Sequence, residues 1–262
     1  MFALLGNGDG TFTKGGVTPT PIGGYLALGD FNHDGNLDFA TSGDLIAYGN
    51  GDGTFQTPVP IYPGLPGNLT YIIAGDLNND GWPDLIIDDD FEASLYVLLN
   101  NHHGGFTEQE IPVVNPSGHG LAPGQMVLSD LNNDGNLDIV FAELYGTGAS
   151  IFLGDGKGGF TFKASVDTPI YTFDTNSTIA VADFNGDGIP DIILSAASTL
   201  SVYLGTGSAD FAEPSFYIGA GPFPGSLLTE NLHGQPAGFP DIVAPDSTGG
   251  VMVLINATNR VQ

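Results

Sequence analysis

The stretch "GDLNNDGWPDLII", residues 75–87, combines many acidic and amide side chains with a strongly apolar end. Three aspartates, two asparagines and a glycine fall within nine residues, and the sequence then becomes apolar at once. Three close variants occur elsewhere: "GDFNHDGNLDFA" from Gly29, "SDLNNDGNLDIVF" from Ser129 and "ADFNGDGIPDIIL" from Ala182. Four copies of one acidic motif indicate a repeat architecture.

The motif recurs at a nearly constant spacing. Its opening residues are separated by 46, 54 and 53 positions, at Asp30, Asp76, Asp130 and Asp183. A second marker, a glycine-rich turn that ends in phenylalanine, alternates with it and ends at Phe12, Phe55, Phe106, Phe160 and Phe211. Between the markers lie short apolar runs of strand length, such as "YIIA", "PDLII" and "LYVLL". We count four strands in each repeat of about 50 residues.

Four-stranded repeats cannot cover their own apolar faces, so neighbouring sheets must stack. Radial stacking of such sheets gives a β-propeller, whereas a straight β-solenoid, the alternative, usually has shorter and more regular coils. The 40 glycines and 18 prolines disfavour long helices. We therefore expect an all-β propeller of four-stranded antiparallel blades, with about five repeats and a partial one at the N-terminus.

The expected organisation is one domain over residues 1–262. The predicted units are a partial blade at 1–23, blades at 24–66, 67–120, 121–174 and 175–222, and a degenerate last blade at 223–262. Both chain ends offer a third strand, "FALL" and "VMVL". Either one of them is displaced when the ring closes, or the chain is a segment of a larger, seven-bladed ring.

The composition points to cations as partners. Thirty acidic residues face four basic ones, which gives a formal net charge of −26. Such a surface repels phosphate backbones and anionic lipids, so we expect no nucleic-acid partner and no membrane insertion. Cysteine is absent, which excludes disulfides and thiolate metal sites. The opening residues contain too short an apolar run for an export signal.

The acidic motif has the ligand chemistry of a calcium loop. Calcium prefers six to eight hard oxygen ligands from alternate residues of a tight loop, with glycine where the chain bends. Numbered from its first aspartate, each loop offers side chains at positions one, three, five and nine and a backbone carbonyl at position seven. The predicted ligands are Asp30, Asn32, Asp34, Asn36 and Asp38; Asp76, Asn78, Asp80, Trp82 and Asp84; Asp130, Asn132, Asp134, Asn136 and Asp138; and Asp183, Asn185, Asp187, Ile189 and Asp191.

This pattern differs from an EF-hand, because position twelve lies in an apolar strand and is Thr41, Ile87, Phe141 or Leu194 instead of glutamate. The simpler alternative, that Asn-Asp-Gly clusters only make tight turns, does not explain three carboxylates kept in register four times. The sequence therefore predicts about four Ca²⁺ sites. The fifth repeat, in which Glu230, His233 and Gln235 stand near the acidic positions, is expected to be metal-free.

Other polar clusters are interpreted mainly as structural features without a binding or catalytic role. The "GNGDGTF" turns are interpreted as plain turns whose phenylalanine packs between blades, with a metal site as the alternative. Asp88 to Glu92 is interpreted as a solvated connection between strands, with an extra cation site or a catalytic pair as the alternative. His102 and His103 are adjacent in a turn, where side chains diverge, so a transition-metal site is not expected. Trp82 is expected to pack at the blade rim, with glycan stacking as the alternative. No nucleophile, histidine and acid combination indicates catalysis, and we predict no catalytic residue.

The loops and the glycine-phenylalanine turns resemble FG-GAP repeats, also called VCBS repeats, the blades of integrin-α-type propellers. That resemblance implies calcium in the hairpin between the first two strands of a blade, a location outside the cell or on its surface, and a role in adhesion or carbohydrate binding. We expect a non-catalytic binding module for a glycan or an extracellular protein. The alternatives are a structural propeller domain of a larger secreted, polysaccharide-active enzyme and a purely structural spacer.

Overall fold

A computed structural model of the chain describes residues 2–17, 24–65, 69–89, 93–114, 121, 123–143, 148–167, 177–196, 199–218, 227–230, 232, 239–245 and 250–256. The chain divides into two compact units, Met1–Pro112 and Val113–Gln262, which are described separately. The described residues form strands and turns without a helix, as the sequence predicts. Accordingly, none of their elements is a helix long and apolar enough to cross a membrane.

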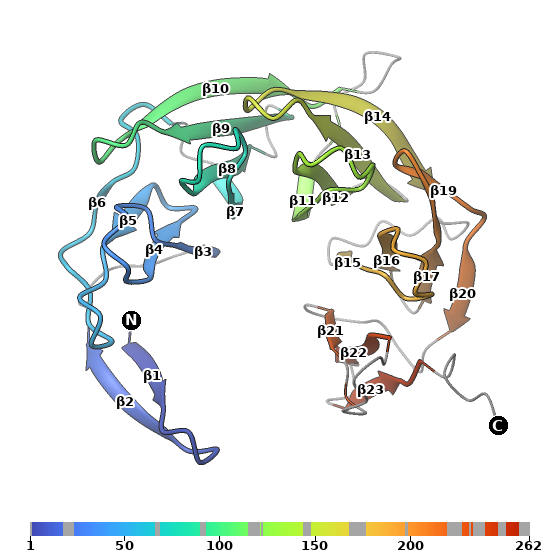
Figure 1. Cartoon of the computed structure of the whole chain (residues 1–262), viewed down its shortest axis with the longest axis horizontal. Coiled ribbons are helices and arrows are strands. Elements are labelled where there is room, and N and C mark those ends of the chain that lie inside the picture. Colours follow the sequence, from blue (N-terminus) through green and yellow to red (C-terminus); the bar gives the residue numbers. More distant parts are fainter. Residues whose placement is uncertain are drawn as a thin grey trace. The chain divides into compact units, whose positions relative to one another are not determined.

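Unit one contains two four-stranded antiparallel sheets and a hairpin (Figure 1), and in each sheet consecutive strands are neighbours. The hairpin is β1 (Phe2–Gly6) and β2 (Phe12–Val17). The first sheet is β3 (Leu26–Gly29), β4 (Asp38–Thr41), β5 (Leu45–Ala47) and β6 (Val59–Pro60). The second is β7 (Leu69–Gly75), β8 (Asp84–Asp89), β9 (Ser94–Asn100) and β10 (Phe106–Pro112).

Unit two repeats the same order with two four-stranded sheets, a three-stranded sheet and a small hairpin. The first sheet is β11 (Pro123–Ser129), β12 (Asp138–Glu143), β13 (Gly148–Gly154) and β14 (Phe160–Asp167). The second is β15 (Thr178–Ala182), β16 (Asp191–Ala196), β17 (Thr199–Tyr203) and β20 (Ser215–Ile218), with the hairpin β18 (Gly205–Gly207) and β19 (Asp210–Phe211) between its last two strands. The last sheet is β21 (Leu228–Glu230), β22 (Asp241–Pro245) and β23 (Val251–Leu254).

The core of each unit lies between adjacent sheets. Every residue of the second strand β8 is buried, which explains the apolar run that follows Asp84. In unit one, Phe31 of the first loop packs edge-on against Phe106 of the next sheet, with ring centroids 6.2 Å apart. In unit two, Phe211 packs against the cluster that contains Leu131 and Tyr203. Phe106 and Phe211 therefore pack between sheets, whereas the prediction concerned the "GNGDGTF" turns, which end at Phe12 and Phe55.

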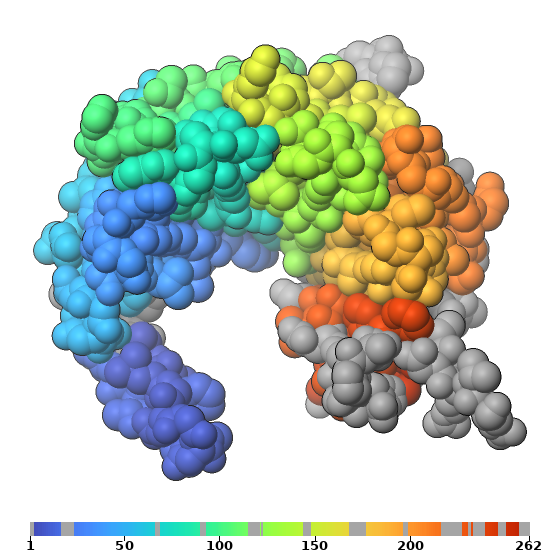
Figure 2. Space-filling view, viewed as in Figure 1, coloured from blue at the N-terminus to red at the C-terminus, as the bar shows by residue number. Residues whose placement is uncertain are grey.

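Phe12 departs from that prediction. It exposes 65% of its surface, and Leu4 of the same hairpin exposes 59%. In the space-filling view the hairpin, in dark blue, projects from the rest of unit one (Figure 2). The hairpin contains only two strands, so no neighbouring sheet within unit one covers the ring.

The interpretation of the acidic run after the second loop as a solvated connection is wrong for its first two residues. Asp88 and Asp89 belong to β8 and are buried. The carboxylate of Asp88 accepts hydrogen bonds from the hydroxyl of Thr70, at 2.7 Å, and from the backbone N–H groups of Thr70 and Tyr71. These donors come from β7, so the charge is compensated inside the sheet. Residues 90–92 lie outside the described residues.

Candidate functional site

The four acidic loops occupy the same place in four sheets. Loop one (residues 30–38), loop two (76–84), loop three (130–138) and loop four (183–191) each connect the first strand of a sheet to the second. The last cross-strand pair below each loop joins its ninth residue to the residue before its first: Gly29 with Asp38, Gly75 with Asp84, Ser129 with Asp138 and Ala182 with Asp191. The loops are therefore hairpin connections, as the sequence predicts.

Within loop two the polar side chains fold over the loop backbone. Asp76 accepts hydrogen bonds from the N–H groups of Asp80 (3.1 Å) and Gly81 (2.9 Å). Asn78 accepts a second bond from the N–H of Asp80, at 3.0 Å, and its amide donates to the Asp80 carboxylate at 2.8 Å. Gly81 has a φ of 87°, a conformation that L side chains rarely adopt, which explains the glycine at position six.

Loops one and three repeat these bonds with equivalent residues. Loop four differs at one point, where Asp183 accepts from the N–H of Gly186. In all four loops, hydrogen bonds thus bring the residues at positions one, three and five together, and their role as metal ligands stays a prediction. The N–H of Asn36 and the amide of Asn32 lower the pKa of Asp34, so its carboxylate stays ionised.

The ninth-position aspartates have a role that sequence reasoning missed. Asp84 is completely buried, and its two oxygens accept the N–H of Leu77, at 2.9 Å, and the N–H of Asn100, at 2.7 Å. These bonds tie the loop to the end of the third strand. Asp38, Asp138 and Asp191 accept two backbone N–H groups in the same way. We call these residues, together with Asp241, the latch aspartates.

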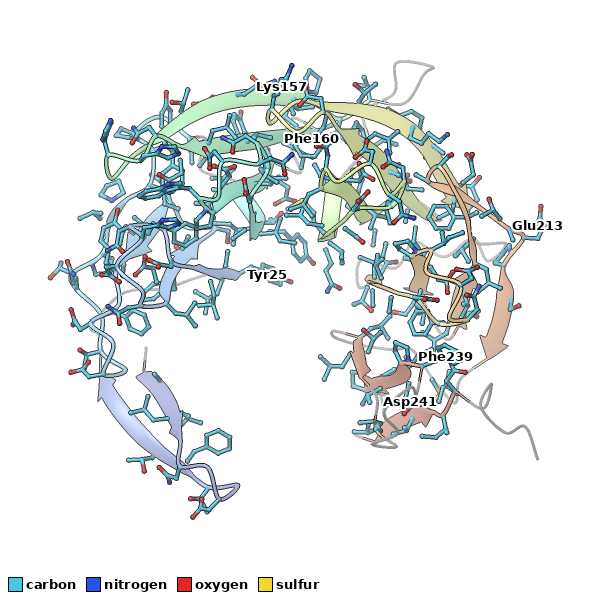
Figure 3. The ribbon with its side chains drawn as sticks, in the orientation of Figure 1. Tyr25, Lys157, Phe160, Glu213, Phe239 and Asp241 are labelled. Carbon is cyan, nitrogen blue, oxygen red and sulfur yellow. The ribbon has the colours of Figure 1, made fainter. Side chains whose placement is uncertain are left out.

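Asp241 shows that the latch does not depend on the rest of the acidic motif. It is completely buried in the last sheet (Figure 3) and accepts the N–H groups of Leu232, at 2.9 Å, and Asn256, at 2.7 Å. Its repeat keeps the Pro-Asp dipeptide but has lost most acidic positions. His233 and Gln235 lie outside the described residues, so the expected lack of metal in this repeat stays a prediction.

Burial raises the pKa of the latch carboxylates in the four acidic loops. It raises the pKa of Asp84 to about 6, although the two backbone donors oppose the shift. Burial likewise raises the pKa of Asp38, Asp138 and Asp191 above the ordinary value. The charges of the first- and fifth-position aspartates add to the rise in each loop, so a cation that neutralised them would favour the ionised latch.

The donor set of the loops fits calcium. In the part of the chain that the structure describes, no group of three or more histidine, aspartate or glutamate side chains is already arranged to hold a metal ion. Positions one, three and five supply two carboxylates and one amide on the exposed part of each loop, whereas the carboxylate at position nine is completely buried. An all-oxygen set on an exposed loop suits Ca²⁺, with backbone carbonyls and water as the remaining ligands. The ligand role predicted for position nine stays a prediction.

Trp82 is not available for stacking on a sugar. The rings of His33 and His102 lie parallel to it on either side, with centroid distances of 3.9 Å and 4.7 Å. Both faces of the indole are therefore covered, which argues against the glycan-stacking alternative for this residue. The Nε2 atom of His102 is hydrogen-bonded to the carboxylate of Asp80, so it is not free for a metal site shared with His103.

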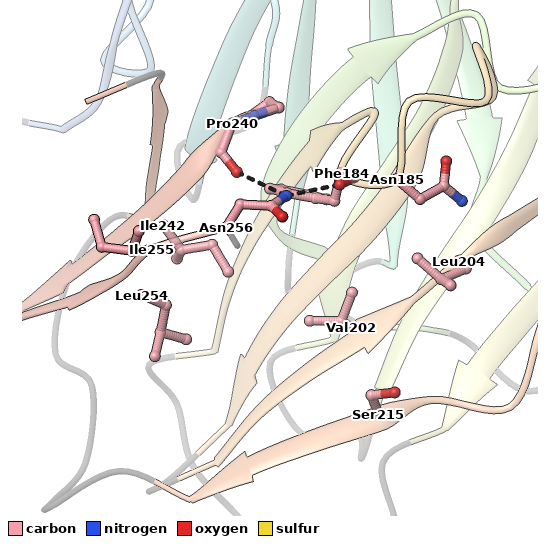
Figure 4. Close-up of a pocket in the computed structure, with 10 residues that line it drawn as sticks. All are labelled: Phe184, Asn185, Val202, Leu204, Ser215, Pro240, Ile242, Leu254, Ile255 and Asn256. Atoms are coloured by element: carbon pink, nitrogen blue, oxygen red, sulfur yellow. Dashed lines mark hydrogen bonds between the residues drawn. The ribbon is translucent and has the colours of Figure 1, made fainter. Parts of the chain in front are cut away.

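A pocket of about 600 Å³ lies in unit two between the last two sheets (Figure 4). The side chain of Asn256 spans its edge and donates to the carbonyl of Phe184 at 2.7 Å. In unit one the equivalent Asn100 donates to the carbonyl of Phe31 at 2.9 Å, and Phe31 there contacts Phe106. The pocket is lined mainly by apolar side chains, which suits an apolar group better than a sugar.

Glu143 at the end of β12 is expected to make stability depend on pH. It accepts a hydrogen bond from the hydroxyl of Ser150 at 2.7 Å, and burial, aided by the charge of Asp167, raises its pKa above the ordinary value of 4.5. A raised native pKa means that the folded state binds the proton more tightly. The contribution of Glu143 to stability should therefore fall as the pH rises from 4.5 through the raised pKa.

The substitution Glu143→Gln tests this expectation, since glutamine cannot ionise. The melting temperature of the variant minus that of the wild type should become more positive between pH 4.5 and pH 7.5. Glu213, an exposed residue, supplies the matched control Glu213→Gln. A difference that stays constant with pH for Glu143→Gln would rule out the proposed linkage.

Comparison with known proteins agrees with the repeat assignment. The FG-GAP-like repeat family matches residues 39–87 and 130–194, which confirms the resemblance seen in the sequence. No curated protein sequence matches the chain.

Solved structures resemble the chain in fold. An Agrocybe aegerita lectin that recognises non-reducing terminal N-acetylglucosamine aligns with a TM-score of 0.65 and 22% identity, over 89% of this chain and 63% of the lectin chain. A Lactobacillus plantarum protein aligns with a TM-score of 0.57 and 13% identity, over 93% of this chain and 73% of that one. The V. cholerae biofilm matrix protein Bap1 gives a TM-score of 0.54 and 12% identity, over 98% and 69%. This chain thus spans less than two thirds of the lectin, and these identities show a propeller-like fold alone.

Proposed function

We propose that this protein is a calcium-stabilised binding module that acts outside the cell. Its residues 39–87 and 130–194 match the FG-GAP-like repeat family. It recognises a glycan or an extracellular protein and catalyses no reaction. The observation that carries the proposal is the fourfold recurrence of one oxygen-rich hairpin loop at the same place in four sheets.

Electrostatics support calcium as the resident ion. The formal net charge of −26 disfavours a compact state unless cations offset it, and the loops concentrate that charge on short exposed segments. Calcium neutralises paired carboxylates without requiring nitrogen or sulfur ligands. The first and fifth positions of each loop would hold the ion through carboxylates and the third through its amide oxygen. The ion has a structural role in this proposal and performs no chemistry.

A surface that could contact a glycan lies on unit one. Tyr25 exposes about half of its surface, its ring lies 4.1 Å from that of Tyr71, and the two hydroxyls are joined by a 3.1 Å hydrogen bond. An aromatic ring that carries a polar hydroxyl can combine apolar contact with hydrogen bonding. The lectin with a similar fold supports glycans as the first ligand class to test.

A glycan and matrix-protein binding screen, run with calcium and with chelator, tests the proposal. We expect retention of a ligand in calcium, its loss in chelator, and no change in the ligand's chemical structure. Tyr25→Ala should reduce glycan retention, whereas Phe12→Ala, which removes an exposed aromatic ring from the first hairpin, should not. Cleavage of a polysaccharide would instead indicate a domain of a polysaccharide-active enzyme, and an intact fold without any ligand would indicate a structural spacer.

A further inference from the structure

Two histidines that do not belong to loop two contact its residue Trp82. Trp82, its seventh residue, lies between the rings of His33 and His102, which are tilted by only 9° and 20° from the indole plane. His33 comes from loop one, and His102 comes from the turn between β9 and β10. Three segments of unit one therefore meet at the position whose backbone carbonyl is a predicted calcium ligand.

The same histidines bind the two residues that precede Trp82. The Nε2–H of His102 donates to the Oδ2 atom of Asp80 at 2.8 Å, and the Nε2–H of His33 donates to the carbonyl of Gly81 at 3.0 Å. The other oxygen of Asp80 accepts the N–H of Trp82 at 2.8 Å. Positions five, six and seven of loop two are thus all oriented by groups outside the ligand set.

The backbone of loop one does not require a histidine at position 33. His33 has a φ of 55°, and the residues at the same fourth position of loops two and three, Asn79 and Asn133, have φ values of 59° and 58°. Asparagine therefore satisfies the left-handed conformation at this position. The imidazole of His33 adds the stack and the hydrogen bond, which asparagine cannot supply in the same form.

The other three loops lack this arrangement at their seventh position. They carry Asn36, Asn136 and Ile189 there, none of which has an aromatic ring to be stacked. Partners outside the ligand set that fix the orientation of a ligand typically change metal affinity about 10- to 100-fold when they are removed. Loop two has two such partners, His33 and His102, among the residues that the structure describes.

We propose that His102 and His33 are positioning residues that pre-organise loop two and make it the tightest of the four calcium loops. This inference rests on the proposed function. The hydrogen bond from His102 restricts the orientation of the Asp80 carboxylate. The hydrogen bond from His33 restricts the Gly81 carbonyl, and the His33 ring packs against one face of Trp82. Less conformational freedom is then lost when the ion binds, and the affinity rises for that reason.

Trp82 is the only tryptophan of the chain, so its fluorescence reports on loop two. The full chain is stripped with chelator and titrated with CaCl₂, with tryptophan emission followed for loop two and calorimetry for all sites. We expect the emission midpoint to precede the bulk of the calorimetric binding. His102→Ala should raise the calcium concentration at that midpoint about 10-fold. His103→Ala, which alters the adjacent exposed imidazole, should leave it unchanged.

Two conservative variants separate positioning from general stability. His102→Gln retains a side-chain donor for Asp80 and should restore most of the affinity that His102→Ala loses. His33→Asn keeps the backbone conformation of position 33, and should change the emission of Trp82 in calcium-free protein while strand content by circular dichroism stays the same. If His102 only stabilised the fold through the packing of its ring, His102→Gln would not recover the calcium affinity that His102→Ala loses.

Three results would each overturn the inference while calorimetry still detects calcium binding. The emission midpoint could be the same for the wild type and His102→Ala, His102→Ala and His103→Ala could shift it equally, or His102→Gln could fail to recover the affinity. If His102→Ala does not fold, an unchanged calcium-free emission and an unchanged midpoint in His33→Asn overturn it instead. Calorimetry without any calcium binding in the wild type would refute the proposed function, and the positioning role with it.

Discussion

Asp138→Ala is expected to lower the free energy of unfolding by about 2–6 kcal/mol. The carboxylate of Asp138 is completely buried and accepts the N–H groups of Leu131 and Gly154, both at 2.9 Å. Alanine would leave two buried donors without a partner, and each such donor costs about 1–3 kcal/mol. Since single domains are stable by only about 5–15 kcal/mol, this loss should be evident in urea unfolding followed by circular dichroism.

The matched control is Asp134→Ala in the same loop. Asp134 is exposed and is a predicted calcium ligand, so its loss should destabilise the protein in calcium and have little effect in chelator. Asp138→Ala and Asp241→Ala should remain destabilising in chelator, because the latch bonds are made to the backbone. If the effect of Asp241→Ala disappeared in chelator, the latch would depend on the metal and this assignment would be wrong.

Removal of calcium is expected to lower the melting temperature markedly. Extracellular calcium modules bind with dissociation constants of about 10⁻⁴ to 10⁻³ M, so about 1 mM free ion contributes roughly 0.4–1.4 kcal/mol per site. Four sites then contribute about 2–6 kcal/mol, and they raise the formal net charge from −26 to −18. Differential scanning calorimetry in EDTA and in calcium-saturated EDTA measures the effect at matched chelator concentration.

The same measurement separates ligand positions from turns. Asp80→Ala should lower the melting temperature in calcium more than Asp9→Ala does, because Asp9 only accepts the N–H and hydroxyl of Thr11 in an exposed turn. Equal shifts for the two variants would indicate that both residues act as plain turn formers.

Local patterns predicted the strands and the loops because both depend on residues close in sequence. The glycine at position six and the aspartates at positions one and five are sufficient to specify the hairpin, and the apolar run after Asp84 specifies a buried strand. The role of the ninth aspartate could not be read in the same way, since an acidic residue at a loop end serves equally as metal ligand or as acceptor. Asp241 was the available signal, because it persists in a repeat without the other acidic positions.

Long-range contacts account for what the sequence did not predict. His33, Trp82 and His102 are far apart in the chain, and only the packing of two sheets brings their rings together. The burial of Asp88 depends on donors from the neighbouring strand β7, which a run of charged letters does not indicate.

Isothermal titration of CaCl₂ into the chelator-stripped full chain measures whether the acidic loops bind calcium and how many ions they hold. The four loops predict binding of about four calcium ions per chain, and Asp80→Ala should remove one of them while leaving the others. The contradicting result is that the wild type shows no heat of calcium binding and that its melting temperature does not respond to EDTA. The acidic loops would then be plain turns that do not bind calcium.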